Sequence, residues 1–430
     1  MKKKRLVFFT LFLCAIFHVP AQETVKVMFY NLLNYPLEDA VPNREVDLAY
    51  ILADYQPDLF YQPDLFLVCE LNNLTGAIDI LNITQTVVSS EFEMANFIPN
   101  SSDDLSGDQN DLQNMFFYNS SKFSLEEQII VPTYLRDFNV YRIKLNTVNQ
   151  DTDPIEIYVI VCHLKASSGT YNAQKRFEMV LDLQDFLTTL PADTNILLGG
   201  DLNVYTVSEP AFQTLLSDSN NIALIDPVNR LGNWHNNSSY IDVFTQSTRT
   251  QSGMGGASGG FDDRFDFILT SENMINNSNI TYVPESYQSY GNNELESCRN
   301  RAINSTDCGT ADSPFSYELR NAIHNFSDHL PVTLSLETEA TFLSVHEFTP
   351  SNRFALESTI INENLILTIE ASELYNQGLF IYNNLGQMVK SVQLNSDVTQ
   401  QINVSDLSDG MYFLNVSNSN TNPIKFIVSN

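Results

Sequence analysis

Short apolar runs separated by polar segments recur from Glu23 to about Glu337. Several of these runs have the length and composition of β-strands, and they lie at residues 24–30, 65–70, 114–118, 156–163, 194–199, 266–269 and 331–337. Amphipathic stretches between them predict helices at residues 44–53, 173–190 and 209–216. This mixed order predicts a layered α/β fold with its functional site at one sheet edge.

The pattern changes after a short joint near residues 340–345. Short β-rich runs follow at residues 365–369, 378–382, 388–394, 400–404, 410–416 and 424–428. Turn-forming sequences separate them, and this spacing predicts a small all-β sandwich. We therefore expect a leader at residues 1–21, a larger domain that carries the chemistry at 22–338, a linker at 339–349 and a C-terminal domain at 350–430.

The N-terminal segment has the features of a secretory signal peptide. Four basic residues, Lys2 to Arg5, precede an apolar run at residues 6–19, and Ala21 provides a small side chain after it. This order predicts cleavage after Ala21 and export. The alternative, a single anchoring helix, requires about 20 apolar residues to span a bilayer, and this run is shorter.

The chain is strongly acidic, with 52 Asp and Glu against 22 Lys and Arg and a net charge of −30. Loss of the four basic residues of the leader changes this charge to −34. Such a balance excludes a broad basic surface for nucleic-acid binding. A polyanionic substrate therefore has to be bound at a local site, with help from metal ions.

Four cysteines remain once Cys14 is removed with the leader. Export permits disulfide formation, and Cys298 and Cys308 lie ten positions apart in a polar segment. We predict a bridge between these two, which would stabilise the fold by constraining the unfolded chain. Cys69 and Cys162 lie in apolar runs and are interpreted as buried free thiols.

Residues 55–60 and 61–66 are two copies of Tyr-Gln-Pro-Asp-Leu-Phe. Two copies are too few for a solenoid, and a proline in each copy disfavours a helix. We interpret the repeat as a local duplication in the loop before the strand at 65–70, with one copy bulging out. Its effect on that strand stays open.

Polar side chains end or open most of the predicted strands. They are Asn31, Glu70, His163, Asp201, Asn203, Asp266, Asp328 and His329. Next to a buried strand, such a side chain costs free energy unless it is paired or binds a ligand. Each one alone is explained by a turn, a helix cap or a satisfied core histidine. Together they offer the oxygen ligands that a hard divalent cation prefers and the imidazoles that transfer protons.

Six segments around these residues carry a family resemblance. They read Met28-Phe-Tyr-Asn-Leu32, Val68-Cys-Glu-Leu71, Cys162-His-Leu-Lys-Ala166, Gly200-Asp-Leu-Asn203, Arg264-Phe-Asp-Phe-Ile268 and Ser327-Asp-His-Leu-Pro-Val332. In this order the segments resemble the motifs of the endonuclease/exonuclease/phosphatase superfamily of metal-dependent phosphodiesterases. The resemblance implies a four-layer α/β sandwich, in which two mixed β-sheets lie face to face and helices cover the outside.

The resemblance also implies a metal site. Asn31, Glu70 and Asp328 would hold the principal ion, which is Mg²⁺, with Mn²⁺ or Ca²⁺ as alternatives. Asp201 and Asn203 would orient the attacking water and brace the phosphate, and Asp201 could hold a second metal.

Proton transfer and substrate contacts complete the implied site. His329, with Asp266 as its carboxylate partner, would transfer a proton or hold the phosphate, and His163 would donate to a non-bridging oxygen. Arg176 lies where many members of the superfamily have an arginine in the helix after the histidine strand, and we assign it to substrate binding.

Other features near the motifs have simpler interpretations. Lys165, Arg249 and Arg264 could face phosphate, although a solvated surface position is the better explanation for each of them. The glycine-rich run at residues 253–260 lacks the Lys and Ser/Thr of a phosphate-binding loop. We interpret it as a flexible loop beside the site.

The C-terminal domain has a resemblance of its own. Phe380-Ile-Tyr-Asn-Asn-Leu-Gly-Gln-Met-Val389, Leu407-Ser-Asp-Gly-Met-Tyr-Phe413 and Lys425-Phe-Ile427 resemble the type A C-terminal sorting domain of the type IX secretion system. The resemblance implies the outer-membrane secretion machinery as a partner and a secreted or cell-surface location.

The sequence thus predicts a secreted, Mg²⁺-dependent phosphoesterase, and the leading hypothesis is a nuclease that cleaves the phosphodiester bonds of extracellular nucleic acid. A phosphodiesterase or phosphatase for phospholipids or small phosphoesters is the alternative within the same chemistry. From a different class, the chain could be a surface-binding module on a catalytically dead scaffold. A dead scaffold typically lacks one of the site residues, and all of them are present here.

Overall fold

The computed structural model describes residues 22–37, 41–53, 61–101, 112–343, 354–369, 374–384, 386–417 and 423–429. The chain divides into two compact units, Met1–Leu343 and Ser344–Asn430. The expected leader at residues 1–21 and the first hexapeptide copy at 55–60 lie outside the described residues. No helix in these described ranges combines the length and the apolar character needed to cross a bilayer.

The first sheet of the larger unit has the order β11-β13-β1-β2-β4-β3, and β12 also pairs with β13. Its strands are β1 (Glu23–Tyr35), β2 (Leu65–Leu71), β3 (Phe92–Met94), β4 (Gln113–Asn119), β11 (Thr281–Tyr282), β12 (Gln288–Ser289) and β13 (Val332–Thr338). β1 runs parallel to β2 and antiparallel to β13. The carboxyl ends of β1 and β2 therefore lie at the same edge as the amino end of β13.

The second sheet has the order β5-β6-β7-β8-β10-β9. Its strands are β5 (Phe123–Val131), β6 (Phe138–Leu145), β7 (Glu156–His163), β8 (Ile196–Asp201), β9 (Leu224–Ile225) and β10 (Asp266–Ser271). β7 and β8 are parallel and end together, with His163 paired opposite Asp201. β10 runs antiparallel to β8 and begins where β8 ends, with Asp266 opposite Asp201.

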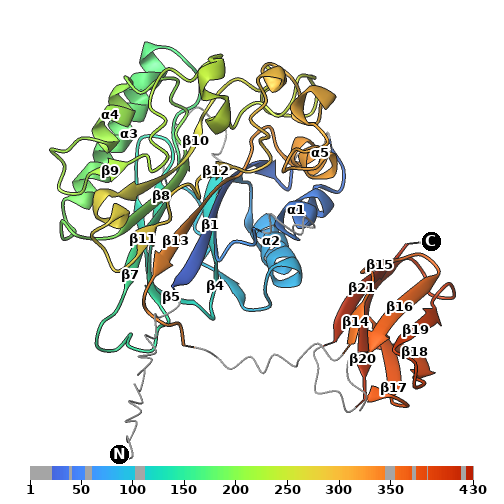
Figure 1. Cartoon of the computed structure of the whole chain (residues 1–430). Helices are drawn as coiled ribbons and strands as arrows, with labels where there is room; N and C mark the ends of the chain where they lie inside the picture. The colour runs from blue at the N-terminus through green and yellow to red at the C-terminus, as the bar shows by residue number, and fades with distance from the viewer. Residues whose placement is uncertain are drawn as a thin grey trace, which may run out of the picture. The chain divides into compact units, whose positions relative to one another are not determined.

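Helices cover the outer faces of both sheets and complete the predicted four layers (Figure 1). α1 (Arg44–Ala53), α2 (Leu74–Val87) and α5 (Tyr317–Phe326) lie on the side of the first sheet, and α3 (Thr170–Leu187) and α4 (Pro210–Leu215) on the side of the second. In the described connections of this unit lie the short 3-10 helices η1 (Ser238–Val243), η2 (Glu272–Ile275), η3 (Glu296–Cys298) and η4 (Thr306–Cys308). This architecture confirms the predicted α/β fold class.

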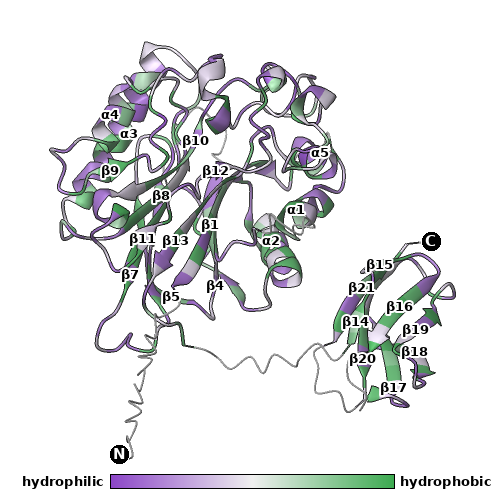
Figure 2. Cartoon of the chain, viewed as in Figure 1, coloured by the Kyte–Doolittle hydropathy of each residue, from purple (hydrophilic) through white to green (hydrophobic). Residues whose placement is uncertain are grey.

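Burial on both faces explains the apolar central strands. In β2 the five residues Leu65 to Cys69 are all fully buried, because the other sheet covers one face and helices cover the other. One core cluster fills the space between the sheets and under α1, α2 and α5, and a second lies between the second sheet and α3 and α4. Apolar colour accordingly gathers on the strands and on the inner faces of the helices (Figure 2).

Most predicted elements are present, and four have the predicted bounds: α1 at Arg44–Ala53, β7 at Glu156–His163, β20 at Gly410–Val416 and β21 at Ile424–Val428. The longer elements that the sequence analysis missed are α2, α5, β5 and β6, and it also missed the strands of two or three residues. Only four of the fourteen residues of α2 are buried, so its apolar stripe is weak, and its start depends on an N-cap in which the Asn73 side chain accepts a hydrogen bond from Gly76 N. β5 is mostly half-buried along its length and lacks a regular alternation.

The second hexapeptide copy anchors the start of β2. The Tyr61 hydroxyl bonds both backbone groups of Val27 at 2.9 and 3.0 Å, and Asp64 accepts from Lys26 N at 2.9 Å. Asp64 also pairs with Lys122 at 2.8 Å. β2 is continuous from Leu65 to Leu71, so the duplication leaves the strand that carries Glu70 intact.

The second unit is all β, as predicted. One sheet contains β14 (Phe354–Leu356), β16 (Asn364–Ile369) and β19 (Thr399–Asn403). The other contains β15 (Ile360–Ile361), β17 (Gly378–Asn383), β18 (Met388–Gln393), β20 (Gly410–Val416) and β21 (Ile424–Val428). Side chains from both sheets share one apolar core.

The expected linker at 339–349 is partly packed. Phe342 is buried against Phe123 of the first unit, and Leu343 N donates to Asn146 O at 2.7 Å. Residues 339–343 are therefore part of the first unit, while residues 344–349 lie outside the described part of the chain.

Candidate active site

The topology brings all eight polar residues predicted at strand ends to one edge of the two sheets. Asn31 and Glu70 lie on the adjacent parallel strands β1 and β2, and His163 and Asp201 end β7 and β8. Asp266 opens β10, and Asp328 and His329 precede β13. Asn203 lies two residues after Asp201, just beyond the end of β8. We call this set, which comes from both sheets, the cup.

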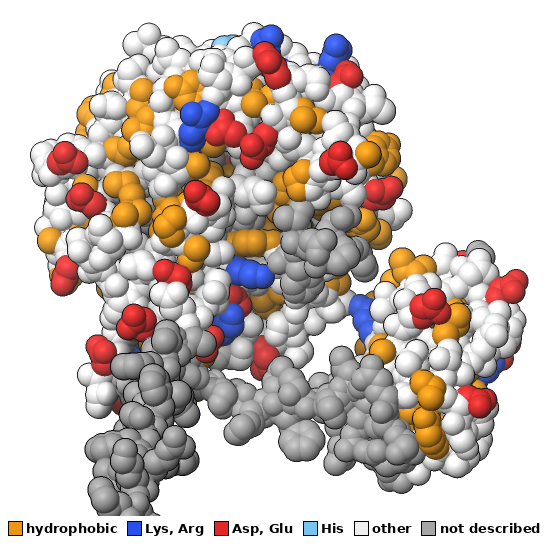
Figure 3. Space-filling view, viewed as in Figure 1, with side chains coloured by type: hydrophobic (Ala, Val, Ile, Leu, Met, Phe, Trp, Pro, Cys, Tyr) orange, Lys and Arg blue, Asp and Glu red, His pale blue; other side chains and the backbone are white. Residues whose placement is uncertain are grey.

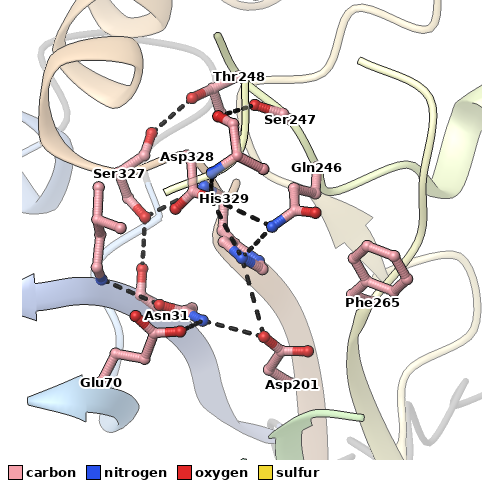
Figure 4. A network of polar contacts seen from close by, with 12 residues as sticks. Asn31, Glu70, Asp201, Gln246, Ser247, Thr248, Phe265, Ser327, Asp328 and His329 are labelled. Carbon is pink, nitrogen blue, oxygen red and sulfur yellow. Dashed lines mark hydrogen bonds and ion pairs between the residues drawn. The ribbon is translucent and has the colours of Figure 1, made fainter. Parts of the chain in front are cut away.

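Asn31 holds two acids of the cup together. Its Nδ2 donates to Glu70 Oε1 at 2.9 Å and to Asp201 Oδ2 at 3.0 Å, and so links the first sheet to the second (Figure 4). Its Oδ1 accepts from Leu33 N at 3.0 Å. The amide nitrogen, not the oxygen, thus faces the carboxylates, and Asn31 spaces them in this structure.

His329 and Asp266 form a buried pair. His329 Nδ1 lies 2.6 Å from Asp266 Oδ2, and both side chains are almost fully buried. The carboxylate can only accept, so Nδ1 carries the proton and Nε2 is directed into the cup. Nε2 lies 3.8 Å from Asp201 Oδ2 and 3.9 Å from Asp328 Oδ2.

A segment before β10 covers His329 and Asp328. Gln246 Nε2 lies 2.6 Å from His329 Nε2 and 3.3 Å from Asp328 Oδ2 (Figure 4). Ala257 N donates to Asp328 Oδ2 at 2.6 Å, and the neighbouring Gly256 lies directly against the Asp328 carboxylate. The glycine-rich loop therefore lies beside the site, as predicted, and its backbone holds one of the acids.

Burial and mutual repulsion make the acids of the cup easy to protonate. Burial, followed by the charge of Asp328, raises the pKa of Glu70 above its ordinary value. Burial, followed by the charge of Asp266, likewise raises the pKa of Asp201. Without a cation, the cup therefore favours carrying extra protons over carrying its full negative charge.

The two histidines differ in protonation. Burial lowers the pKa of His163 well below its ordinary value, and the nearby cations Arg136 and Lys165 lower it further. His163 is therefore neutral, and its Nε2 contacts with Glu70 at 3.7 Å and Asp201 at 3.8 Å are not ion pairs. Burial alone would also lower the pKa of His329, but the adjacent acids, Asp266 first, outweigh burial and raise it.

The side chains present fit a hard divalent cation. Glu70, His163 and Asp201 each offer a ligand atom within 4.8 Å of the others, and Asp201, Asp266 and His329 form a second such group. Both groups at this edge include Asp201, and neither includes Asp328. Within the described ranges, Asp328 Oδ1 is buried without a hydrogen-bond partner, which is the state expected of an oxygen that receives a ligand.

Three arginines were candidates for phosphate binding from the sequence. All three are buried and bond to groups inside the protein, which corrects those predictions. Arg176 is fully buried, donates twice to Glu209 Oε2 at 2.7 and 2.9 Å, and holds the carbonyls of Lys165 and Ser167. It positions the loop after His163 and cannot reach a substrate.

Arg249 and Arg264 are buried in the same way, and neither is a surface residue. Arg264 makes a two-pronged pair with Asp226, with both distances 2.8 Å. Arg249 donates to backbone carbonyls, including His324 O at 2.8 Å. The sequence could not separate these roles because a buried guanidinium and a phosphate-binding one occur in similar local sequences.

Gln246 and the backbone N–H of Ala257 are the contacts that sequence reasoning missed. Gln246 lies in an irregular segment without periodicity, and a backbone N–H carries no sequence signal. The glycine at 256 was the available clue, since its φ of +61° and its closeness to Asp328 both exclude a larger residue.

The predicted cysteine pair is bonded: Cys298 and Cys308 form a disulfide that closes the connection between η3 and η4. Cys69 and Cys162 are free and buried, as expected.

Comparison with known proteins identifies the second unit. Residues 362–430 match the family model of the secretion system C-terminal sorting domain. The chain therefore carries a sorting domain, which indicates a secreted or cell-surface protein and confirms that prediction. No curated protein matches the chain by sequence.

Solved structures similar to the chain cover mainly the larger unit. An endonuclease/exonuclease/phosphatase family protein from Bacteroides thetaiotaomicron shows 15% identity over 74% of this chain and 98% of that one, with a TM-score of 0.43. D. rerio TDP2 with a single-strand DNA product shows 15% identity over 73% and 99%, with a TM-score of 0.45. A mannosyl-6-phosphatase from Bacteroides thetaiotaomicron shows 14% identity over 73% and 99%, with a TM-score of 0.43. At such identities and scores, the argument for function depends on the geometry of the cup.

Proposed function

We propose that the larger unit is a divalent-metal-dependent phosphoric ester hydrolase, and that its substrate is the phosphodiester backbone of nucleic acid outside the cell. The observation that carries this proposal is the convergence, at one edge of two sheets, of Glu70 and Asp201, the neutral His163 and the Asp266–His329 pair. Oxygen ligands, a neutral donor and a carboxylate-backed imidazole are the groups that phosphoryl transfer to water requires.

Each residue has a defined role in this proposal. Asp201 accepts from the attacking water and orients it, while Asn203, whose backbone N–H is held by Asp201 Oδ1 at 3.0 Å, braces the phosphate. Asp266 fixes the tautomer and the ring plane of His329, whose Nε2 exchanges a proton at the phosphate. His163 is neutral and donates a hydrogen bond to charge that develops on a non-bridging oxygen.

The acids would hold the metal. Glu70 and Asp201, with Asp328 on the opposite side of His329, would provide its oxygen ligands, and Asn31 keeps Glu70 and Asp201 at a fixed separation. When bound, Mg²⁺ would polarise the phosphoryl oxygen and neutralise the charge that accumulates in the transition state.

The decisive experiment is a substrate panel of plasmid DNA, RNA, sphingomyelin and a sugar monophosphate, assayed with Mg²⁺ for wild type and His329→Ala. We expect wild type to cleave nucleic acid and His329→Ala to be slower by roughly 10²- to 10⁴-fold. His235→Ala is the matched control, because it removes a histidine that also pairs with an aspartate, Asp263, but is 59% exposed at the side chain.

Activity confined to the lipid or the sugar phosphate would establish the alternative substrate class. Absence of hydrolysis of any member of the panel would support the dead-scaffold hypothesis. The sorting domain supports an extracellular substrate, because it indicates a secreted or cell-surface protein.

A further inference from the structure

Two exposed tyrosines and a lysine form a small surface beside the cup. Tyr171, in the first turn of α3, is 67% exposed, and Tyr134, in the connection between β5 and β6, is 42% exposed. Lys175 Nζ lies 4.0 Å from the centre of the Tyr134 ring and 5.8 Å from that of Tyr171. We call these three residues the tyrosine ledge. Its ammonium group also pairs with Glu178 at 2.8 Å.

Hydrogen bonds tie the ledge to the site. Arg136, two positions after Tyr134, donates from Nη1 to Leu164 O at 3.1 Å, and Asn203 of the cup donates from Nδ2 to the same oxygen at 3.3 Å. Leu164 follows His163 directly. The loop that carries Tyr134 is therefore fixed one residue away from a cup histidine.

The start of α3, which carries Tyr171 and Lys175, is also fixed by hydrogen bonds to the loop after His163. The buried Arg176 follows Lys175 in α3 and bonds the carbonyls of Lys165 and Ser167, so it fixes the start of the helix against the loop after His163. Both tyrosines thus extend from rigid backbone next to the cup. Single exposed tyrosines are common, but two rings in contact with one ammonium group at the border of a candidate phosphodiesterase site are a specific arrangement.

We propose that the tyrosine ledge binds the bases of a single-stranded nucleic acid whose scissile phosphate lies in the cup. This inference rests on the proposed function and narrows it to single strands, because the π-faces of bases are accessible to exposed rings only when the bases are unpaired. Lys165 and Lys175, which are only partly buried, place positive charge along this side of a strongly acidic chain, where the adjoining phosphates would pass. A sugar monophosphate has no second phosphate to use these cations.

The test compares two 12-mers with identical backbones, oligo-dT and a fully abasic strand, as substrates of the full-length protein with Mg²⁺. Tyr171→Ala should raise KM for oligo-dT by roughly five- to 150-fold, the range expected for the loss of one stacked base. KM for the abasic strand should not change. Tyr171→Trp should retain the wild-type KM, and Lys175→Gln should lower the slope of log KM against log salt by about one.

Tyr317→Ala is the matched control. Tyr317 is 51% exposed and is also in the first turn of a helix, α5, but it lies at the end of that helix remote from Asp328. Equal affinity for oligo-dT in wild type, Tyr171→Ala and Tyr134→Ala would overturn the ledge while leaving the proposed hydrolysis intact. An equal loss on the abasic strand would also overturn it, since no base would be involved. Cleavage of sugar or lipid phosphates without cleavage of either strand would refute the nuclease assignment itself.

Discussion

Gly256 offers a direct test of whether Asp328 is part of the working site. A Cβ placed on Gly256 would lie 2.4 Å from Asp328 Cγ and Oδ2 and 2.7 Å from Oδ1. Ordinary contact begins at 3.4 Å, so Gly256→Ala has to displace the carboxylate or the loop by about 1 Å. A displacement of this size at a reacting centre lowers the rate by about 100-fold, or about 2.7 kcal/mol in kcat/KM.

Two other glycines of the same loop separate this effect from backbone strain. Gly253 has a φ of +90°, and within the described structure no heavy atom lies within 4 Å of the place that a Cβ on Gly253 would occupy. Gly259 has equally open surroundings and no left-handed conformation. Gly253→Ala should therefore lose about 1–2 kcal/mol of local stability but retain its activity, and Gly259→Ala should change neither property.

The assays are kcat/KM on the preferred phosphodiester, a Mg²⁺ titration and urea denaturation of all three variants. We expect Gly256→Ala alone to combine a large loss of kcat/KM with a higher Mg²⁺ requirement. If kcat/KM of Gly256→Ala is no lower than that of Gly253→Ala, displacing the Asp328 carboxylate does not affect catalysis. The assignment of Asp328 to the metal is then wrong.

Three further predictions follow from the burial and pairing of the cup. Because the raised pKa values of Glu70 and Asp201 leave extra protons on the metal-free protein, its stability should fall as pH rises through those values. Mg²⁺ should therefore raise Tm more at about pH 8 than at about pH 5.5, and a larger rise in Tm at the lower pH would contradict this reasoning. A chelator should also abolish hydrolysis. Asp266→Asn should lower kcat by roughly 10²- to 10⁴-fold with little change in KM, since it alters the tautomer of His329 and not substrate contacts; an equal rise in KM would indicate a binding role. Arg264→Met should lower the free energy of unfolding by roughly 3–5 kcal/mol, because it leaves a buried carboxylate unpaired; normal stability with lost activity would restore the phosphate-binding role.

The sequence predicted the strands that carry the site because burial on both faces leaves an unusual pattern. Continuous apolar runs that end in Glu70, His163 or Asp201 have few explanations other than a polar edge of a covered sheet. The carboxyl ends of these strands lie together because the strands pair in parallel. The sequence indicates this pairing only through the order of its predicted strands and helices. Both the fold class and the residues of the cup could be predicted from the sequence in this way.

The segment before β10 that covers Asp328 and His329 could not be predicted from the sequence, for a physical reason. Gln246 and Ala257 reach Asp328 and His329 through loop geometry, which tertiary contacts determine and no periodicity records. The half-exposed elements, α2 and β5, escaped prediction because their burial patterns are weak. Local sequence thus indicates which side chains need partners, and only the folded chain shows which partners they find.

The misassigned arginines lead to a stronger argument for the metal. Arg176, Arg249 and Arg264 point into the protein, where carboxylates and backbone carbonyls take their donors. Acidic side chains also outnumber Lys and Arg on the face of the larger unit seen in Figure 3. The acids of the cup already repel one another strongly enough to favour protonation, so an approaching phosphodiester would add a further negative charge to an unfavourable field. Because these three arginines are directed inward, they do not compensate that charge at the reacting phosphate, whereas a divalent cation from solvent would. Activity should therefore follow the concentration of divalent metal far more steeply than it follows the substitution of any one of these three arginines by lysine.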